Sequence, residues 1–462
     1  MKSLYSPERI KHTHHRLRTD TISAILNEFD RDIMKLEPSN RSEKYAKMAQ
    51  SVFRFFRGSA YLFYYDVTRI PFPFHTPEDR PVWIQGDLHF ENFGAFRNED
   101  GQMVYDVNDF DEGYLGSYVY DLLRMAVSIV LIAQMRHFGE SDAREAVEGY
   151  LKAYYKQIRR FADGRDDAAR MNFTEEQSSG LLRKLLRKVN KRSASHLLED
   201  VTSMSGQRRR FNSTSELEPL KPKQRKLLES AWFEYVGTLE EAGARGEGFY
   251  KIKDVVVKHA SGTASIGLDR YYVLVEGGME RTALDDLVLE AKEVRAPVPA
   301  YFLPHSESFW EQFPHQGKRV ITTQRSMHHK ADPYLGYFTL NGDHYYVRER
   351  SPFKKRLKID QLETVDDLVS TVKQMGRITA KMHARADRDV EKALLPYHSE
   401  EEIVRAIGSD SDAFISQLSF AAITYAKQAN SDYEMFCSWI REEGLVSGNE
   451  EAAGNADQIP IT

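Results

Sequence analysis

The side chains most able to do chemistry are concentrated in two short segments of the chain. The first reads GDLHFEN at residues 86–92, and the second reads NDFDEG at residues 108–113. Carboxylate and amide oxygens of this kind suit Mg²⁺, which proteins hold through one or two carboxylates while phosphate oxygens fill other positions. An Asp that is not bound to the metal could accept a proton from a hydroxyl nucleophile. The competing interpretation is that these Asp, Asn and Gly residues only form turns.

Each of these acidic segments follows a predicted short strand. Residues 82–84 and 103–107 are apolar runs typical of strands, and Asp100-Gly101 between them is a hairpin-turn signal. Residues 118–135 then form a helix that is apolar on most sides and is therefore expected to be buried. Because both acidic segments begin where a strand ends, we expect them to converge on one point. That expectation favours a functional site over a set of turns.

The two segments also resemble motifs of known families. Gly86-Asp87, Asn92, Asp109-Phe110-Asp111 and Tyr120-Asp121-Leu122 resemble the catalytic and metal loops of aminoglycoside-phosphotransferase-like kinases. More closely, the pattern G-D-x-H-x-E-N-F-G followed by N-D-F-D-E resembles an uncharacterised bacterial family of unknown function. Phe56-Arg57-Gly58 and Tyr346-Val347-Arg348 also look like that family. The resemblance extends over residues 45–440, which is most of the chain.

The kinase resemblance implies a two-lobe α+β fold, ATP and Mg²⁺ as cofactors, and a role for each matching residue. Such enzymes mainly position the reactants and neutralise charge on the transferred phosphoryl group. Asp87 would be the catalytic residue that orients or deprotonates the acceptor hydroxyl. The others would hold the metal (Asn92 and Asp109), anchor the loop (Asp121) or support the site (His89 and Asp111).

The nucleotide-binding half of such a site is predicted far downstream. Strands expected at residues 255–258, 271–276, 287–291, 337–340 and 345–348 would form a small antiparallel sheet, with turns at Gly277-Gly278 and Asn341-Gly342 and a helix near 317–327. In the segment 261–267, Gly262, Thr263, Ser265 and Gly267 are predicted to bring backbone N–H groups close to phosphates. Lys292, near the end of the third strand, would add a point charge. An ordinary hairpin and a solvated lysine are the alternatives.

These parts come in an unusual order, because kinases place the glycine-rich turn and the lysine before the catalytic loop. A helix at 364–386 ends in Met382-His383 and resembles the kinase helix that directly precedes that loop, which here lies far upstream. We therefore predict a circularly permuted kinase-like fold. Its parts are the helical large lobe with the acidic loops in 1–245, the small antiparallel-sheet lobe in 246–355, helices that complete the large lobe in 356–443, and a mobile tail in 444–462.

One position departs from the kinase pattern. Kinases pair the strand lysine with a Glu on the next helix, but this chain has Thr322 at the corresponding place. Glu290 and Glu293 flank Lys292 and are expected to point away from it, since side chains alternate along a strand. The sequence therefore leaves three functions open. They are an ATP- and Mg²⁺-dependent phosphotransferase, a kinase-like nucleotide sensor or scaffold without phosphotransfer, and a metallophosphatase, for which further His ligands are missing.

Composition excludes other classes of protein. The chain has 64 basic and 69 acidic residues, a net charge of −5 and one cysteine, Cys437, so a nucleic-acid field, an internal disulfide and a cysteine metal cluster are not expected. The polar, basic start and an apolar run of only 11 residues at 125–135 predict no secretory signal and no membrane span, hence the cytoplasm. Thirteen basic residues against four acidic ones in 183–226 mark either a solvated face or a site for an anionic or hydroxyl-bearing acceptor. His12, His14 and His15 are expected to lie in a disordered start.

Overall fold

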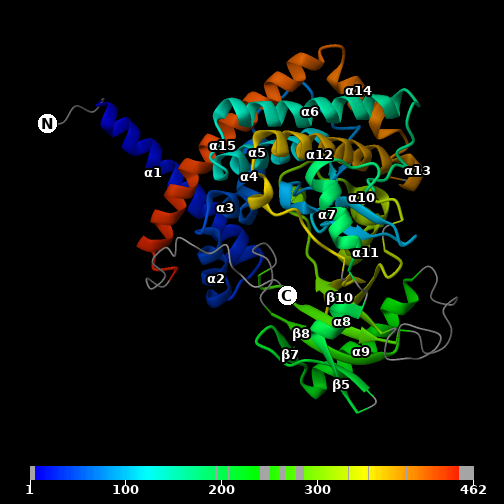
Figure 1. Ribbon diagram of the computed structural model, residues 1–462. Helices are drawn as coiled ribbons and strands as arrows, with labels where there is room; N and C mark the ends of the chain where they lie inside the picture. The colour runs from blue at the N-terminus through cyan, green and yellow to red at the C-terminus, as the bar shows by residue number, and fades with distance from the viewer. Residues whose placement is uncertain are drawn as a thin grey trace.

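A computed structural model gives the fold of the chain, in which a helical part lies against a smaller part built around a β-sheet (Figure 1). The structure describes residues 6–192, 195–206, 208–239, 250–259, 266–276, 286–330, 332–351, 353–391 and 394–446. Three of the predicted phosphate-binding residues lie outside these ranges, namely Gly262, Thr263 and Ser265. The predicted Gly277-Gly278 turn and the predicted tail from residue 447 onward also lie outside them.

The chain begins with four helices, α1 (Pro7–Leu26), α2 (Pro38–Met48), α3 (Val52–Gly58) and α4 (Ala60–Val67). Helix α1 projects from the helical part at its N-terminal end (Figure 1), so the prediction that His12, His14 and His15 lie in a disordered start was wrong. Apolar residues spaced three and four apart over 42–56 predict one helix with a single apolar face, but the structure divides this segment between α2 and α3. The division occurs at Ser51, which has an extended backbone and accepts a hydrogen bond from the Arg54 N–H at 3.2 Å, as an N-cap residue does.

Four short strands carry the two acidic segments. They are β1 (Val82–Ile84), β2 (Phe93–Arg97), β3 (Met103–Val107) and β4 (Tyr114–Gly116), and β1 pairs with β4 while β2 pairs with β3. The first acidic loop, 86–92, connects β1 to β2, and the second acidic loop, 108–113, connects β3 to β4. The Asp100-Gly101 turn joins β2 to β3, not the two strands between which it was predicted, because residues 93–97 form a strand that the sequence pattern had not revealed.

The helical part is organised around α5 (Tyr118–Met135), which forms where the sequence predicted a buried helix. It packs with α6 (Glu140–Ala162), α12 (Val365–Arg385) and α15 (Ser411–Glu442). Helix α5 is long and apolar enough to cross a membrane, but 83% of that stretch is buried inside the protein, as in a core helix. Thr364 and Asp367 form a capping-box pattern in the sequence, which predicts a helix start, and α12 does begin after Thr364, whose hydroxyl accepts from the Asp367 N–H at 3.1 Å.

The larger sheet has six antiparallel strands in the order β11-β12-β10-β9-β8-β7. Their bounds are β7 (Leu217–Pro219), β8 (Ile252–Lys258), β9 (Arg270–Val275), β10 (Leu287–Glu293), β11 (Gly336–Leu340) and β12 (Asp343–Glu349). Five of these strands and the Asn341-Gly342 turn were predicted, so the expectation of a helical protein with an antiparallel sheet is confirmed. The sixth strand, β7, lies upstream of the predicted boundary at 246. The predicted helical large lobe in 1–245 includes residues 139–240, and three short strands within that range correct the expectation that it is helical.

One helix covers the larger sheet, and a crossover after β12 links the sheet to the helical part. Helix α9 (Pro222–Gly237) packs Trp232 and Tyr235 against the face of the sheet that carries Leu289. After β12 the chain returns to the helical part, and the Ala95 N–H donates to the Lys355 carbonyl at 2.7 Å, which fastens this crossover to β2. The other elements are α7 (Gly180–Asn190), α8 (Ser195–Val201), β5 (Thr202–Ser205), β6 (Arg208–Phe211), α10 (Glu307–Gln312), α11 (Gln316–Met327), α13 (Arg388–Glu391) and α14 (Ser399–Ile407).

Candidate functional site

A cleft of about 720 Å³ opens between the acidic loops and the six-stranded sheet. Its size suits a drug-sized or nucleotide-sized ligand. Five predicted site residues line it, and they are Asp87, Asn92, Asp109, Asp111 and Lys292. Basic side chains outnumber acidic ones among the described lining residues, eleven against six. The cleft therefore favours anionic ligands.

The two acidic loops touch through their backbones at Gly86. This glycine has a φ of +87°, and a Cβ placed there would lie 2.1 Å from the carbonyl oxygen of Glu112. Only glycine adopts this conformation without strain and allows so close an approach. The contact sets the distance between the first and second acidic loops, and so between their carboxylates.

Asp121, in the first turn of α5, binds the backbone at the start of the first acidic loop. One of its carboxylate oxygens accepts from the Gln85 N–H at 2.7 Å and the other from the Gly86 N–H at 2.9 Å. His383, near the end of α12, lies 3.2 Å from the same carboxylate through Nε2. Asp121 is fully buried and does not line the cleft, so its contacts orient the backbone of the loop.

Asp87 reaches the cleft but is not isolated there. Its Oδ1 accepts from Nε of Arg124, a fully buried residue of α5. Burial raises the pKa of Asp87, and the cations Arg124 and Arg57 oppose that rise. The Arg124 partner leaves Oδ2 as the oxygen that could receive a proton. The sequence offered one signal for Arg124, a charged residue inside an otherwise apolar helix, three positions after Asp121.

Asn92 and Asp109 present oxygen atoms to the cleft. The Asn92 Nδ2 donates to the Asp87 carbonyl at 2.8 Å, which orients the amide so that its Oδ1 accepts no hydrogen bond from any described residue. The Asp109 Oδ1 is buried without a hydrogen-bond partner in the described structure. Burial would raise the pKa of Asp109, but Lys292, Arg348 and other nearby cations outweigh it and lower the pKa. Both residues can therefore offer oxygens to a cation.

Lys292 crosses the cleft and contacts the second acidic loop. It lies on β10, is 5% exposed, and forms an ion pair with Asp111, 181 residues earlier in the chain. The second carboxylate oxygen of Asp111 is buried without a partner among the described residues. Lys292 and the two acidic loops thus line the same cleft, although the elements from α5 to β9 lie between them in the sequence.

Glu290 and Glu293 differ in orientation. Glu290 lies two positions before Lys292, so both side chains point to the same face of β10, and the expectation that Glu290 points away was wrong. It binds Arg348 at 2.7 Å and Arg270 at 3.1 Å. Both arginines line the cleft beside Lys292, although the site prediction did not include them. Arg348 belongs to the Tyr346-Val347-Arg348 motif, which was the only sequence signal for this pair.

Helix α11 supplies no acidic partner for Lys292. Thr322 is half-buried and does not line the cleft. The helix instead presents Arg319, which is fully buried and donates to the Gly113 carbonyl at 2.9 Å and to the Arg295 carbonyl at 3.0 Å. Burial lowers the pKa of Arg319 to about 10. In the described structure the carboxylate next to Lys292 is therefore the one of Asp111.

His89 and Gly267 lie outside the cleft lining. His89 is buried, and its Nε2 accepts from Nε of Arg57 at 3.1 Å. Burial, reinforced by Arg57, lowers the pKa of His89 well below its usual value. Gly267 has a φ of +82° and packs against Leu36, and its neighbour Leu268 lines the cleft. The Nε2 atom of His89 lies 3.8 Å from Asp87 Oδ2, but it already accepts the hydrogen bond from Arg57 and is not free to bind a metal ion, which does not favour the metallophosphatase alternative.

The basic segment 183–226 contributes no described residue to the cleft. Its charges lie on α7, on the β5–β6 hairpin and on α9, where they pair locally. Arg187, for example, contacts Glu175 at 2.7 Å, and Arg225 contacts Asp254 at 3.1 Å. These pairs favour the interpretation of a solvated face for this segment.

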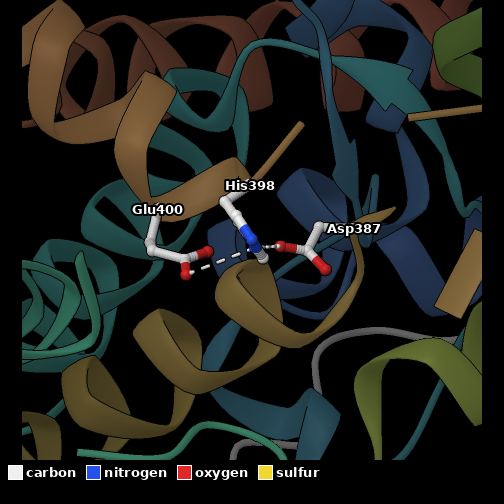
Figure 2. A group of neighbouring side chains, drawn as sticks. All are labelled: Asp387, His398 and Glu400. Atoms are coloured by element: carbon white, nitrogen blue, oxygen red, sulfur yellow. Dashed lines mark hydrogen bonds and ion pairs between the residues drawn. The ribbon is translucent and has the colours of Figure 1, made fainter. Parts of the chain in front are cut away.

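A second titratable cluster joins the end of α12 to the start of α14. Figure 2 shows His398 between Asp387 and Glu400, with distances of 3.1 Å and 3.9 Å from its Nδ1. These three are the group in the described structure whose ligand atoms lie within 4.8 Å of one another. Burial and the nearby Asp387 raise the pKa of Glu400 to about 7. Asp387 also accepts from the Ser399 N–H at 3.3 Å, so the cluster ties two helices together.

Comparison with known proteins gives a family and no activity. A family model described as "Uncharacterized protein conserved in bacteria (DUF2252)" matches residues 37–439. No curated protein and no solved structure matches the chain.

Proposed function

The chain belongs to this uncharacterised bacterial family, and from the geometry of its cleft we propose that it transfers a phosphoryl group from Mg²⁺-bound ATP to a hydroxyl acceptor. One observation carries the proposal. Lys292 of the sheet meets Asp111 across a cleft that Asp87, Asn92 and Asp109 also line. Phosphoryl transfer needs such a combination, a lysine for the phosphates and oxygen ligands for the cation, held on opposite walls.

The nucleotide side of the cleft would be the sheet. Lys292, Arg270 and Arg348 form a cationic group there, and Glu290 fixes the directions of the two arginines. Arginine binds phosphate oxygens through two parallel hydrogen bonds, whereas lysine acts as a point charge. These side chains would bind the phosphates and hold them against the acidic loops.

The metal would bind to the acidic loops. Among the described residues, Asp109 Oδ1 is buried without a hydrogen-bond partner and Asn92 Oδ1 accepts no hydrogen bond. One carboxylate and one amide are enough, since Mg²⁺ in such sites takes most other ligands from phosphates and water. Bound Mg²⁺ and ATP would supply the phosphoryl group and neutralise charge on it.

Asp87 would act on the acceptor. Arg124 holds its Oδ1, so Oδ2 can orient the acceptor hydroxyl and take its proton. Asp121 holds the same loop through the N–H groups of Gln85 and Gly86. The rigid backbone would keep Asp87 in line with the phosphates, which is the main contribution of the protein in this chemistry.

A circularly permuted, two-lobe kinase-like fold would explain how these parts meet. Helix α12 contacts β1, and His383 near its end lies 3.2 Å from Asp121, which is 262 residues earlier. In an unpermuted chain this helix would lead directly into β1 and the first acidic loop. The sheet, the crossover at 350–364 and α12 also follow one another in the expected order.

A second candidate is a nucleotide-binding protein without phosphotransfer. Two observations favour it. Lys292 is already paired with Asp111, and α11 carries Thr322 at the position where kinases have the acidic partner of this lysine. The Lys292–Asp111 pair would have to loosen for Lys292 to act on the transferred phosphoryl group, whereas nucleotide binding through the other cations could leave this pair intact.

The test combines binding with turnover. Because a ligand that binds the folded state stabilises it, Mg²⁺-ATP should raise the melting temperature under both candidates, and Lys292→Ala should weaken that effect. Asp109→Asn should abolish slow ATP turnover if phosphotransfer occurs. Asp100→Asn is the matched control. Asp100 is exposed, lies in the turn before β3 whereas Asp109 follows β3, and pairs only with Lys330 among the described residues. Stabilisation without turnover would establish the second candidate, and no stabilisation would refute both.

A further inference from the structure

A second group of arginines that line the cleft comes from elements outside the sheet. We call Arg54, Arg57 and Arg356 the arginine wall. Arg54 and Arg57 come from α3, and Arg356 comes from the crossover after β12. All three line the same cleft as Asp87. They are separate in sequence from the cationic group of the sheet, which lies on β9, β10 and β12.

The arginine wall has fewer negative partners than positive charges. Arg57 forms an ion pair with Glu91, and Arg356 lies 3.8 Å from the same carboxylate. Arg54 forms no side-chain hydrogen bond or ion pair with any described residue, although its backbone N–H is held by Ser51. Two of the three guanidinium groups therefore share one carboxylate, Glu91 of the first acidic loop, and that of Arg54 has no carboxylate partner among the described residues.

The geometry of Arg57 is fixed before any ligand arrives. Its Nε donates to His89 Nε2 at 3.1 Å, its Nη1 contacts Glu91, and its guanidinium lies 5.9 Å from the ring centre of Phe53. Its Nη2 donates no hydrogen bond to the described residues and remains as a donor. An arginine held in this way binds oxyanions with little loss of side-chain entropy.

We propose that the hydroxyl acceptor carries an oxyanion, a phosphate or a carboxylate, that the arginine wall binds while its hydroxyl faces Asp87. This inference rests on the proposed function, since it concerns the acceptor of that same site. The two groups of cations have different carboxylate partners, since Arg57 and Arg356 of the wall lie against Glu91 of the first acidic loop, whereas Arg270 and Arg348 of the sheet bind Glu290. The basic segment 183–226, which the sequence offered as an acceptor site, contributes no described residue to this cleft.

A binding experiment tests the wall separately from the nucleotide. The probe is inorganic phosphate, titrated by calorimetry into protein saturated with Mg²⁺ and a non-hydrolysable ATP analogue, with acetate as the carboxylate probe in a second titration. In the double variant Arg54→Ala, Arg356→Ala, phosphate should bind at least about tenfold more weakly, since one charge-assisted contact accounts for roughly that factor. Arg187→Ala is the matched control, an arginine of the basic segment that is 57% exposed, and it should bind as the wild type does.

The outcomes separate the two proposals. If the analogue binds but phosphate and acetate do not, or bind equally well to the double variant, the wall does not recognise an acceptor and the inference is overturned. If the analogue itself fails to bind, the proposed function fails, whatever phosphate does. Arg57→Lys, which keeps the charge but not the fork geometry, should weaken phosphate binding without unfolding the protein.

Paired acceptors test the chemistry of the substrate. The pairs are polyols with and without a phosphate or a carboxylate, such as glycerol against glycerol phosphate and glycerol against glycerate. ADP release should increase at least about tenfold for one charged member of a pair, and the double variant should lose that preference for the charged member. Equal rates for charged and uncharged members would contradict the inference, and the better of the two charged compounds would identify the oxyanion.

Discussion

Gly86 offers the sharpest test of how the two acidic loops are held together. Replacing it with alanine adds a single Cβ, which would lie 2.1 Å from the Glu112 carbonyl oxygen. The backbone at Gly86 has a φ of +87°, so alanine would also be strained there. The left-handed conformation costs a residue with a Cβ about 1–2 kcal/mol, and the forced shift of a packed backbone costs about 1–3 kcal/mol more. We expect Gly86→Ala to lower the free energy of unfolding by about 2–5 kcal/mol.

Gly101 is the matched control for this change. It also has a positive φ, of +74°, but it lies in the exposed turn of the β2–β3 hairpin, and nothing lies within 4 Å of the place that a Cβ would take there. Gly101→Ala therefore measures the conformational strain alone, about 1–2 kcal/mol. The difference between the two variants isolates the contact between Gly86 and Glu112.

Urea unfolding followed by circular dichroism measures both free energies, and calorimetry with Mg²⁺-ATP measures what happens to the cleft. Gly86→Ala should separate the acidic loops and weaken nucleotide binding, whereas Gly101→Ala should leave binding unchanged. Equal destabilisation by the two substitutions would show that the Glu112 carbonyl is not held against Gly86. The argument that this contact positions the carboxylates would then fail.

Three further predictions concern buried charges. Asp121→Asn should lower the free energy of unfolding by about 2–4 kcal/mol, because one buried N–H loses its acceptor, and it should also weaken nucleotide binding. The control is Asp432→Asn, because Asp432 on α15 is also buried but does not line the cleft. This control variant should unfold at lower urea concentration without a change in nucleotide binding. Burial raises the pKa of Glu112 from 4.5 to about 7, so the stability that its protonated form provides is complete below pH 4.5 and is lost as the pH rises through about 7. Glu112→Gln should therefore flatten this part of a plot of unfolding free energy against pH. An unchanged slope in the variant would contradict the assignment of this pH dependence to Glu112. Lys381→Met leaves Asp106 as an unpaired buried charge and should cost about 3–5 kcal/mol, part of which Asp106→Asn in the same chain should restore in a double-mutant cycle; additive effects would refute the pairing.

Local sequence patterns predicted most of the individual elements. Helix α5 has the bounds that its apolar run indicated, and α12 begins at the predicted Thr364 cap. The expected helix over 42–56 was divided because Ser51 caps a new helix, and a polar side chain that binds its own backbone can outweigh apolar periodicity. The pairing of β1 with β4 was not predicted, since strands of three residues carry too little pattern to choose a partner.

The sequence also predicted which residues of the candidate site could do chemistry, but it did not predict their hydrogen-bond and ion-pair partners. The sequence identified Asp87, Asp109 and Lys292 as residues able to do chemistry. It did not indicate that Arg124 would pair with Asp87, or that α11 would turn Arg319 toward the second acidic loop. The prediction assumed that Glu290 and Glu293 both point away from Lys292. Glu293 is one position from Lys292 and points to the other face of β10, but Glu290 is two positions away and shares the face of Lys292.

The amino-acid order alone was enough to assign helices, strands and chemically capable side chains, because these follow from periodicity, capping and residue chemistry within a few neighbouring positions. Folding in three dimensions decided which of those side chains meet. Lys292 and Asp111 are 181 residues apart and His383 and Asp121 are 262 apart, and no local pattern encodes such distances. Their contacts arise only when the sheet, the crossover and α12 pack on the core, since packing, and not propensity, brings remote charges into one buried space.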